Sequence, residues 1–586
     1  MGTIKKLAAS IREYKKPAIW TIILMVLEVI IEVSIPFITA ELINDKVVSG
    51  EEALDLGKVL LLGGLLIVLA FISLLCGGIG GYTCAKASSG FSKNLRNDIF
   101  NKIQSYSFEN IDKFSSASLV TRLTTDASNV QMSFMMLIRT AIRSPLMFIF
   151  SIIMSYILGG VLAATFVVVI PLLIFGLLLI AKKAMPAFRS VFKKYDKLNE
   201  SIEENVRGMR VVKGYSREDH EKEKFSDASE NIRKDFTKAE RIIALNTPLM
   251  QFCMYFNMIF ILGVGAYIAI TGGGKLVNVG HISAMLNYGM QILMSLMMLS
   301  MIYVMLTMSA ESAKRICEVL DEESTLKNPE NAISEVKDGS IAFENVSFKY
   351  SKEAKRFALE NINLKIESGM TVGIIGGTGS SKSTLVQLIP RLYDVTEGSI
   401  LVGGEDVRKY DLDTLRGSVA MVLQKNLLFA GTINENLRWG NENATQEEII
   451  EACKLAQAHE FVSSFPDGYE THIEQGGTNV SGGQKQRLCI ARALLKRPKV
   501  LILDDSTSAV DTKTDAFIRE GFKSYIPETT KIIIAQRISS VQDADIIIVM
   551  DNGKIESLGT HSELLSSSQI YREVYEQQIG GGKNED

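Results

Sequence analysis

The chain has 586 residues and a formal net charge of −3 at pH 7, with 22% of its residues charged. Acidic and basic groups nearly balance, so the sequence lacks the basic footprint of nucleic-acid-binding proteins, and we expect no nucleic-acid partner. Its 6 cysteines form no CxxC pair, which argues against a disulfide framework or a cysteine-ligated metal.

Hydropathy divides the chain into two parts. Residues 1–316 are dominated by long apolar runs, whereas residues 338–586 alternate short Val/Ile-rich runs with polar helical stretches. We therefore expect a membrane α-helical domain, a linker over residues 317–337 that contains Pro329, and a second domain of α/β class.

Six apolar runs in the first part are long enough to cross a bilayer core of about 30 Å as helices. Lys and Arg are concentrated in the N-terminus and in residues 85–130 and 182–241. By the positive-inside rule these segments are cytoplasmic, so we expect a multi-pass protein of the cell membrane with both termini in the cytoplasm. The predicted spans are residues 18–43, 59–84, 132–158, 161–181, 242–270 and 282–308.

The two long cytoplasmic stretches carry mixed charges and apolar residues at helical spacing, which predicts that they continue the membrane helices. A turn-like segment interrupts each of them, at residues 112–118 in the first and at residues 214–219 in the second.

A phosphate-binding loop follows the apolar run 372–375. In a strand, Gly-rich loop and helix, backbone N–H groups cradle phosphate oxygens, and here Lys382 would meet the β and γ phosphates while Ser383 reaches Mg²⁺. Ser381 stands where the usual pattern has glycine. The loop residues are Gly376, Gly377, Thr378, Gly379, Ser380, Ser381, Lys382, Ser383 and Thr384.

A second apolar strand, residues 500–505, ends in two acids, Asp504 and Asp505. Packing alone does not explain two carboxylates at the end of a buried strand, and Asp504 is placed to hold the Mg²⁺ shell.

The run VSGGQKQR lies between these motifs, at residues 480–487. With it, the whole chain resembles the ATP-binding-cassette (ABC) family, and specifically its six-span half-transporter exporters. The resemblance implies a membrane domain of six helices followed by an α/β P-loop nucleotide-binding domain that uses ATP and Mg²⁺. It also implies that Ser481, Gly482, Gly483 and Gln484 cap the γ-phosphate of an ATP held by the phosphate loop of a second chain.

Further roles follow from the same resemblance. Tyr350 would stack on adenine, and Gln424 would link Mg²⁺ to the membrane domain. Residues 508–511 would form the loop that crosses the dimer, and the two turn-like segments would be coupling helices. The implied Mg²⁺ ligands are Ser383, Gln424 and Asp504.

Three positions depart from the family pattern. Asp505 replaces the glutamate that positions the attacking water, Gln536 replaces a histidine that contacts the γ-phosphate, and Ser381 replaces glycine. An aspartate carboxylate sits back by roughly 1.5 Å, and a misplacement of this order lowers a rate by about 10²-fold. Residues 474–477 also read EQGG where the family often has GERG.

All three departures lie on the side that binds ATP through this chain's own loop, whereas the SGGQ residues are intact. We therefore predict an obligate heterodimer whose partner is a second ABC half-transporter with glutamate and histidine at the matching positions. This chain would contribute a degenerate ATP site, and its Ser481 would complete the partner's catalytic site. The alternative is sequence drift within an active homodimer.

Evidence on the substrate is thinner. Glu28 and Glu32, one helical turn apart in the first span, could attract cationic amphiphiles, or could pair with a Lys or Arg of a neighbouring span. Arg139 and Arg143 repeat this spacing in the third span, where an interfacial position is expected. The sixth span holds eight methionines between Met285 and Met308, which suit either a binding surface or ordinary packing.

The predicted function is ATP-driven export of small amphiphilic, multidrug-type compounds from the cytoplasm or the inner leaflet of a bacterial membrane. The chain would be an ABC-type ATPase and translocase, with hydrolysis mainly at the partner's site. The alternatives are a lipid flippase, a peptide exporter, and a nucleotide-sensing regulatory subunit that transports nothing.

Overall fold

The computed structural model describes residues 2–44, 56–272, 277–351, 353–506 and 510–580. The chain divides into two compact units. Unit 1 comprises residues 1–104 and 115–322, and unit 2 comprises residues 105–114 and 323–586. A short segment from the first half of the sequence therefore belongs to the same unit as the second domain.

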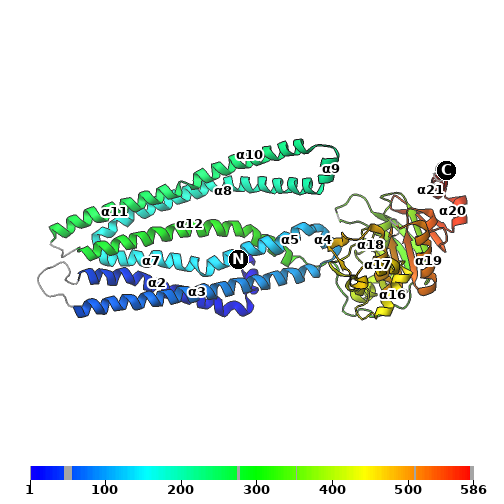
Figure 1. Ribbon diagram of the computed structural model, residues 1–586, viewed down its shortest axis with the longest axis horizontal. Coiled ribbons are helices and arrows are strands. Elements are labelled where there is room, and N and C mark those ends of the chain that lie inside the picture. The colour runs from blue at the N-terminus through cyan, green and yellow to red at the C-terminus, as the bar shows by residue number, and fades with distance from the viewer. Residues whose placement is uncertain (1, 45–55, 273–276, 352, 507–509, 581–586) are drawn as a thin grey trace. The chain divides into compact units, whose positions relative to one another are not determined.

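Unit 1 is helical, and several of its helices are long (Figure 1). The helix α12 (Val279–Asp321) continues into residues 317–337, which the sequence analysis assigned to the linker. The helices are α1 (Gly2–Ala9), α2 (Lys15–Asn44), α3 (Leu56–Gln104), α5 (Ser116–Thr121), α6 (Ala127–Ile138), α7 (Thr140–Gly159), α8 (Ala164–Arg207), α9 (Met209–Gly214), α10 (Glu218–Ile243), α11 (Asn246–Thr271) and α12 (Val279–Asp321).

Five helical runs among the described residues are long and apolar enough to span a membrane. The third run, Ser116–Phe188, contains 73 residues and includes two of the spans expected from the sequence. The chain turns between them at Gly160, whose φ of 46° is a left-handed conformation that glycine adopts at little cost. Beyond this turn, Val169 and Leu173 of α8 belong to a buried cluster with Cys253 and Leu293, and Phe148 packs against that cluster.

The two stretches predicted to be cytoplasmic are interrupted close to the expected positions. In the second, Gly208 and Tyr215 flank the short helix α9, which joins α8 to α10 (Figure 1). In the first, the helix ends at Gln104 and breaks again at Ser115, where φ is 58°. The piece between these breaks, α4 (Phe108–Phe114), is the part that belongs to unit 2.

Unit 2 contains two larger sheets. A four-stranded antiparallel sheet has the order β2-β1-β4-β5, and a six-stranded sheet has the order β12-β11-β3-β10-β9-β6. In the second sheet β11, β3, β10, β9 and β6 are parallel. Parallel strands are buried on both faces, which explains why the β9 sequence VLILD is apolar until its last residue and is buried throughout.

The elements of unit 2 follow the α/β alternation that the sequence predicts. The strands are β1 (Ile341–Phe348), β2 (Leu359–Ile366), β3 (Thr371–Gly376), β4 (Glu397–Val402), β5 (Glu405–Asp406), β6 (Val419–Val422), β7 (Gly431–Thr432), β8 (His472–Ile473), β9 (Val500–Asp504), β10 (Thr530–Ile534), β11 (Ile546–Asp551) and β12 (Lys554–Gly559). Besides α4, the helices are α13 (Lys382–Gln387), α14 (Leu412–Ser418), α15 (Ile433–Arg438), α16 (Gln446–Leu455), α17 (His459–Ser464), α18 (Gly482–Leu495), α19 (Thr512–Tyr525), α20 (His561–Ser567) and α21 (Gln569–Gly580).

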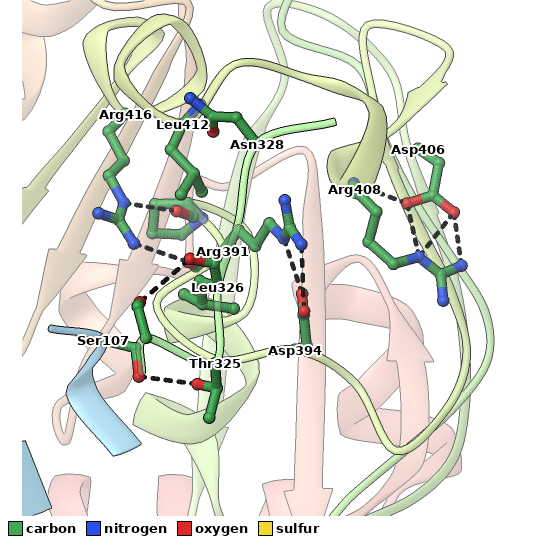
Figure 2. Close-up of polar contacts among 12 residues, drawn as sticks. Ser107, Thr325, Leu326, Asn328, Arg391, Asp394, Asp406, Arg408, Leu412 and Arg416 are labelled. Atoms are coloured by element: carbon green, nitrogen blue, oxygen red, sulfur yellow. Dashed lines mark hydrogen bonds and ion pairs between the residues drawn. The ribbon is translucent and has the colours of Figure 1, made fainter. Parts of the chain in front are cut away.

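The segment 105–114 is fixed to unit 2 by polar contacts. The hydroxyls of Ser107 and Thr325 lie 2.8 Å apart, and both are drawn in Figure 2. The Asn110 side chain donates from Nδ2 to the carbonyl of Glu323 at 3.1 Å. Tyr393 donates from its hydroxyl to Asp112 Oδ2 at 2.8 Å. The segment is thus attached both to the start of the predicted linker and to the α/β part of unit 2.

The chain around Tyr393 is itself braced. Arg391 makes an ion pair with Asp394, with Nε and Oδ1 2.7 Å apart. Arg416 donates to the carbonyl of Arg391 at 3.0 Å, and Figure 2 shows these groups side by side. The chain around Tyr393, which contacts the segment 105–114, is therefore fixed by an ion pair and a hydrogen bond within unit 2.

Candidate functional site

The motif residues of unit 2 follow four neighbouring parallel strands. The phosphate loop begins at Gly376, the end of β3, and Asp504 is the last residue of β9. Gln536 and Gln424 each lie two residues beyond the ends of β10 and β6. Because these strands are adjacent in the order β3-β10-β9-β6, the four motifs meet at one edge of the sheet.

The phosphate loop is closed around its lysine. Lys382 donates from Nζ to the carbonyls of Gly376 and Gly377 at 2.9 and 2.8 Å. Burial lowers the pKa of Lys382, whereas the nearby carboxylates of Asp504 and Asp505 act in the opposite direction. The ammonium therefore sits in the loop with neutral partners that a phosphate could replace.

Ser381 carries strain that glycine would not. Its φ of 69° and ψ of 27° lie in the left-handed region, which costs an L-residue about 1–2 kcal/mol. Serine therefore occupies a position whose backbone conformation favours glycine.

Ser383 and Asp504 are brought together as a magnesium site requires. Ser383 donates from Oγ to Asp504 Oδ1 at 3.0 Å. A hydroxyl and a carboxylate are the hard oxygen ligands that Mg²⁺ prefers, so this pair fits the ion. Asp504 is buried, and burial raises its pKa, with Asp505 adding to the shift while the Ser383 hydrogen bond opposes it.

Asp505 lies between two glutamine side chains. Its Oδ2 accepts a hydrogen bond from Gln536 Nε2 at 2.8 Å and another from Gln424 Nε2 at 3.3 Å. Burial raises the pKa of Asp505, and these two hydrogen bonds oppose that shift. The structure therefore joins three of the predicted site residues in one contact network, although the sequence offered no reason to expect Gln424 and Asp505 to touch.

The SGGQ residues form the exposed beginning of α18. Ser481 accepts from the backbone N–H of Gln484 at 3.3 Å, and the Gln484 side chain accepts from the N–H of Ser481 at 2.9 Å. This reciprocal capping box leaves the first N–H groups of a 14-residue helix at the surface.

The loop predicted to cross the dimer is described only in part. Residues 508 and 509 lie outside the described residues. Val510 is buried, and Asp511 caps α19 by accepting from the N–H of Thr514 at 2.9 Å.

Tyr350 lies against the phosphate-loop helix. Its hydroxyl is 2.8 Å from Thr384 Oγ1, and its side chain remains 45% exposed. Tyr393 meets the Tyr350 ring edge-on, with ring centroids 5.3 Å apart. Since Tyr393 also holds Asp112, one side chain links the predicted adenine-binding residue to the segment 105–114.

Two residues near the site escaped the sequence analysis. One is Tyr393, and the other is Gln578 of α21, which makes two hydrogen bonds to the loop that carries Gln536. It donates from Nε2 to the carbonyl of Gln536 at 2.8 Å, and its Oε1 accepts from the N–H of Ile538 at 2.9 Å. A glutamine in a polar C-terminal helix gives no local signal of such a contact, which only the tertiary fold creates.

Comparison with known proteins decides the family. Residues 18–306 match the ABC transporter transmembrane region, and residues 359–508 match the ABC transporter nucleotide-binding family. The chain is 38% identical over 577 residues to the ABC transporter ATP-binding protein YfiB of Bacillus subtilis, covering 98% of this chain and 99% of that protein. The chain belongs to the ABC transporter family.

Other similar proteins extend over the same length. The chain is 32% identical to the protein YgaD of Bacillus subtilis, and the match covers 98% of this chain and 99% of YgaD. The name of YgaD provisionally describes it as a multidrug export ATP-binding/permease protein. The structure of a bacterial Atm1-family ABC exporter with ATP bound matches with a TM-score of 0.82 and 23% identity, covering 97% of this chain and 98% of that one.

These matches confirm the predicted fold class, a helical membrane domain followed by an ABC nucleotide-binding domain. One membrane region and one nucleotide-binding domain in a single chain make an ABC half-transporter, an ATPase and translocase that acts in a membrane.

Proposed function

We propose that this chain is the degenerate-site subunit of a heterodimeric ABC exporter of small amphiphilic compounds. Its own phosphate loop holds ATP with little hydrolysis, and its SGGQ residues complete the catalytic site of a partner that has glutamate and histidine at the matching positions. Both termini lie in the cytoplasm.

The contact network of Asp505 is the observation that carries this proposal. In phosphoryl transfer, the residue at this position must hold the attacking water with a free carboxylate oxygen. Here Oδ2 already accepts hydrogen bonds from Gln424 and Gln536. The Asp505 side chain is also one methylene shorter than that of glutamate. Its carboxylate is therefore set back from the expected position of the attacking water and is already hydrogen-bonded to two neutral amides.

Binding of Mg²⁺ and ATP needs none of the changed side chains. Lys382 would contact phosphate, and Ser383, Gln424 and Asp504 would hold Mg²⁺, which supplies charge neutralisation at the phosphates. Tyr350, partly exposed beside the phosphate-loop helix, would stack on adenine. Retention of these groups beside the altered Asp505 and Gln536 supports a site that binds without efficient hydrolysis.

An uncovered surface in unit 1 supports a partner chain. The helix α9 packs against α8 and α10 at the end of their hairpin. Its Val211 is 61% exposed, and Tyr215, which follows it, is 78% exposed. Apolar side chains exposed at such a tip are typical of a protein interface.

The substrate class is supported by the methionines of α12. Met290, Met294, Met297 and Met301 are exposed and follow one another at spacings of four, three and four residues, so they share a face of the helix. Flexible thioethers suit a surface that accepts varied apolar shapes. YgaD, the relative whose name refers to multidrug export, is consistent with the same class.

Steady-state hydrolysis tests the proposal. The purified chain alone should hydrolyse ATP slowly, and co-expression with an ABC half-transporter that has glutamate and histidine at the matching positions should raise turnover by about 10²-fold or more. Photolabelling with an azido-ATP would show that the chain alone still binds nucleotide. Robust turnover by the chain alone would overturn the heterodimer and favour an active homodimer.

A further inference from the structure

Two acids of the first membrane helix share a single cation. Glu28 and Glu32 lie one turn apart in α2. The guanidinium Nη2 of Arg143, from α7, is 2.7 Å from each carboxylate oxygen of Glu32 and 3.7 Å from Glu28 Oε1. Arg143 thus reaches the acids of α2 from a neighbouring span. The acids of α2 therefore do pair with a cation of a neighbouring span, but Arg143 contacts Glu32 closely and Glu28 only at 3.7 Å.

Glu28 is the acid that remains incompletely paired. It is only 7% exposed, and its Oε2 has no hydrogen-bond partner among the residues that the structure describes. Across from it, Gly77 of α3 presents backbone, since a Cβ there would stand 3.2 Å from Glu28 Oε1. The other titratable groups near Glu28 are Arg139, which is exposed, and Cys76, which is buried.

The charges of this cluster do not balance at contact distance. Two carboxylates face the one guanidinium of Arg143, while the exposed Arg139 acts on Glu28 only at longer range. A buried carboxylate oxygen without a close partner is costly in a membrane protein. The cluster therefore lacks a second positive charge in contact with its acids, and Glu28 Oε2 and Glu32 are the groups that such a charge would satisfy.

An apolar strip begins beside the cluster. Gln291 of α12 donates from Nε2 to the carbonyl of Glu32 at 3.5 Å and accepts from Ser151 Oγ of α7 at 2.9 Å. Met294 and Met298 follow Gln291 by three and seven residues, on the same face of α12, and are 51% and 42% exposed. A negative cluster therefore lies at one end of an adaptable thioether surface.

We propose that Glu28, Glu32 and Arg143 form a binding site for the positively charged group of an amphiphilic substrate, whose apolar part lies along Met294 and Met298. This inference rests on the proposed export of amphiphiles and specifies their charge. A phosphonium, quaternary ammonium or protonated amine approaches Glu32, the more exposed acid. Arg143 then moves toward Glu28, which already lies within 3.7 Å. Two cations then face two acids, and each carboxylate has a partner.

Binding of two probes that differ in charge tests the site. The full chain, in nanodiscs of zwitterionic lipid, is dialysed against tetraphenylphosphonium or against uncharged triphenylphosphine oxide, with empty nanodiscs as the background. The wild-type chain should prefer the cation. Glu28→Gln should weaken binding of the cation by roughly tenfold and leave the neutral probe unchanged. Glu41→Gln, the same change in the same helix outside the cluster, should alter neither.

The variant Arg143→Gln distinguishes an effect of charge on cation binding from an effect of misfolding. Removing the competing guanidinium should tighten binding of the cation, whereas a misfolded bundle would weaken binding of both probes. Equal binding of the two probes by the wild-type chain, or unchanged cation binding in Glu28→Gln, overturns the inference and leaves amphiphile export standing. Binding of neither probe overturns both.

Discussion

The residue at position 505 does more than shorten a side chain. Asp505 has a φ of 48°, a left-handed conformation that aspartate tolerates better than most residues because its short side chain can hydrogen-bond locally. A glutamate there would place its carboxylate closer to the attacking water, but glutamate adopts this left-handed backbone conformation less readily than aspartate. The aspartate that we propose to weaken hydrolysis therefore suits the local backbone conformation.

Restoring the three altered positions should restore hydrolysis at this site. The variant with Ser381→Gly, Asp505→Glu and Gln536→His regains the water-holding carboxylate, the γ-phosphate contact and an unstrained loop. We expect turnover to rise by about 10²-fold, measured in a heterodimer whose partner lacks its own catalytic glutamate. Nucleotide affinity should change little, because Lys382 and Asp504 are untouched. A triple variant that retains ATP but stays inactive would place the defect in the partner's signature.

Asp504 should reduce the stability of the nucleotide-free protein at neutral pH. Burial raises its pKa, so the folded state keeps the proton to a higher pH than the unfolded state does. The group therefore contributes stability below the ordinary aspartate pKa of about 3.9, and this contribution is lost as the pH rises through the raised pKa.

The variant Asp504→Asn removes this pH-dependent loss. Without nucleotide, its free energy of unfolding at pH 7 should exceed that of the wild type, so that it unfolds at a higher temperature. The difference should shrink as the pH falls toward 4, and Mg²⁺-dependent ATP binding should be lost. Thermal unfolding of the two proteins from about pH 4 to pH 8 measures the effect, and a gap that widens toward low pH would contradict it.

At the scale of elements, the sequence could predict each motif but not which motifs touch. The strand, loop and helix around Lys382 and the apolar strand before Asp504 are readable because local patterns specify them. The contact of Gln424 with Asp505 depends on the strand order β3-β10-β9-β6, which is a tertiary property. Gln578 and Tyr393 were missed for the same reason, since both act on the site from elements with no motif of their own.

Tyr393 should determine how firmly the segment 105–114 is held. Tyr393→Phe keeps the ring beside Tyr350 but removes the hydrogen bond to Asp112. A hydrogen bond to a charged group contributes about 1.5–3 kcal/mol, so amide exchange within residues 105–114 should accelerate by roughly tenfold or more. Hydrogen-exchange mass spectrometry measures this.

A buried tyrosine elsewhere in unit 2 provides the control for this measurement. Tyr410 donates to the carbonyl of Val402 at 2.8 Å, so Tyr410→Phe also removes one hydrogen bond. Acceleration confined to residues 105–114 in the Tyr393 variant would support a direct link. Equal acceleration of that segment in both variants would indicate general loosening of the domain.

At the scale of the whole molecule, hydropathy could predict a membrane half and a nucleotide half, because both are set by composition over long stretches. It could not predict that residues 105–114 belong with the nucleotide domain, since the attachment depends on single contacts such as Asn110 to Glu323. Nor could it pair Arg143 with Glu32, whose approach depends on how α2 packs against α7. Local periodicity specifies helices, whereas their partners are chosen by packing.

The proposed division of labour between two chains predicts unequal effects of two substitutions in one subunit. In the heterodimer, Ser481→Ala should lower turnover by about 10²-fold or more, because the partner's competent site loses a group that caps the γ-phosphate. Asp505→Ala should change turnover far less, since the site it serves contributes little hydrolysis. Steady-state ATPase rates of the two variants, at saturating ATP, measure the difference.

Loss of a helix cap alone must be distinguished from loss of catalysis, because Ser481 also caps α18 and its removal costs about 1 kcal/mol. Thr445 provides a matched control, since it caps α16 with the same reciprocal capping box, through Glu448. Thr445→Ala should destabilise the domain to a similar extent while leaving turnover near the wild-type rate. If Ser481→Ala and Asp505→Ala depress turnover equally, the signature and the phosphate loop of this chain serve equivalent sites, and the heterodimer assignment is wrong.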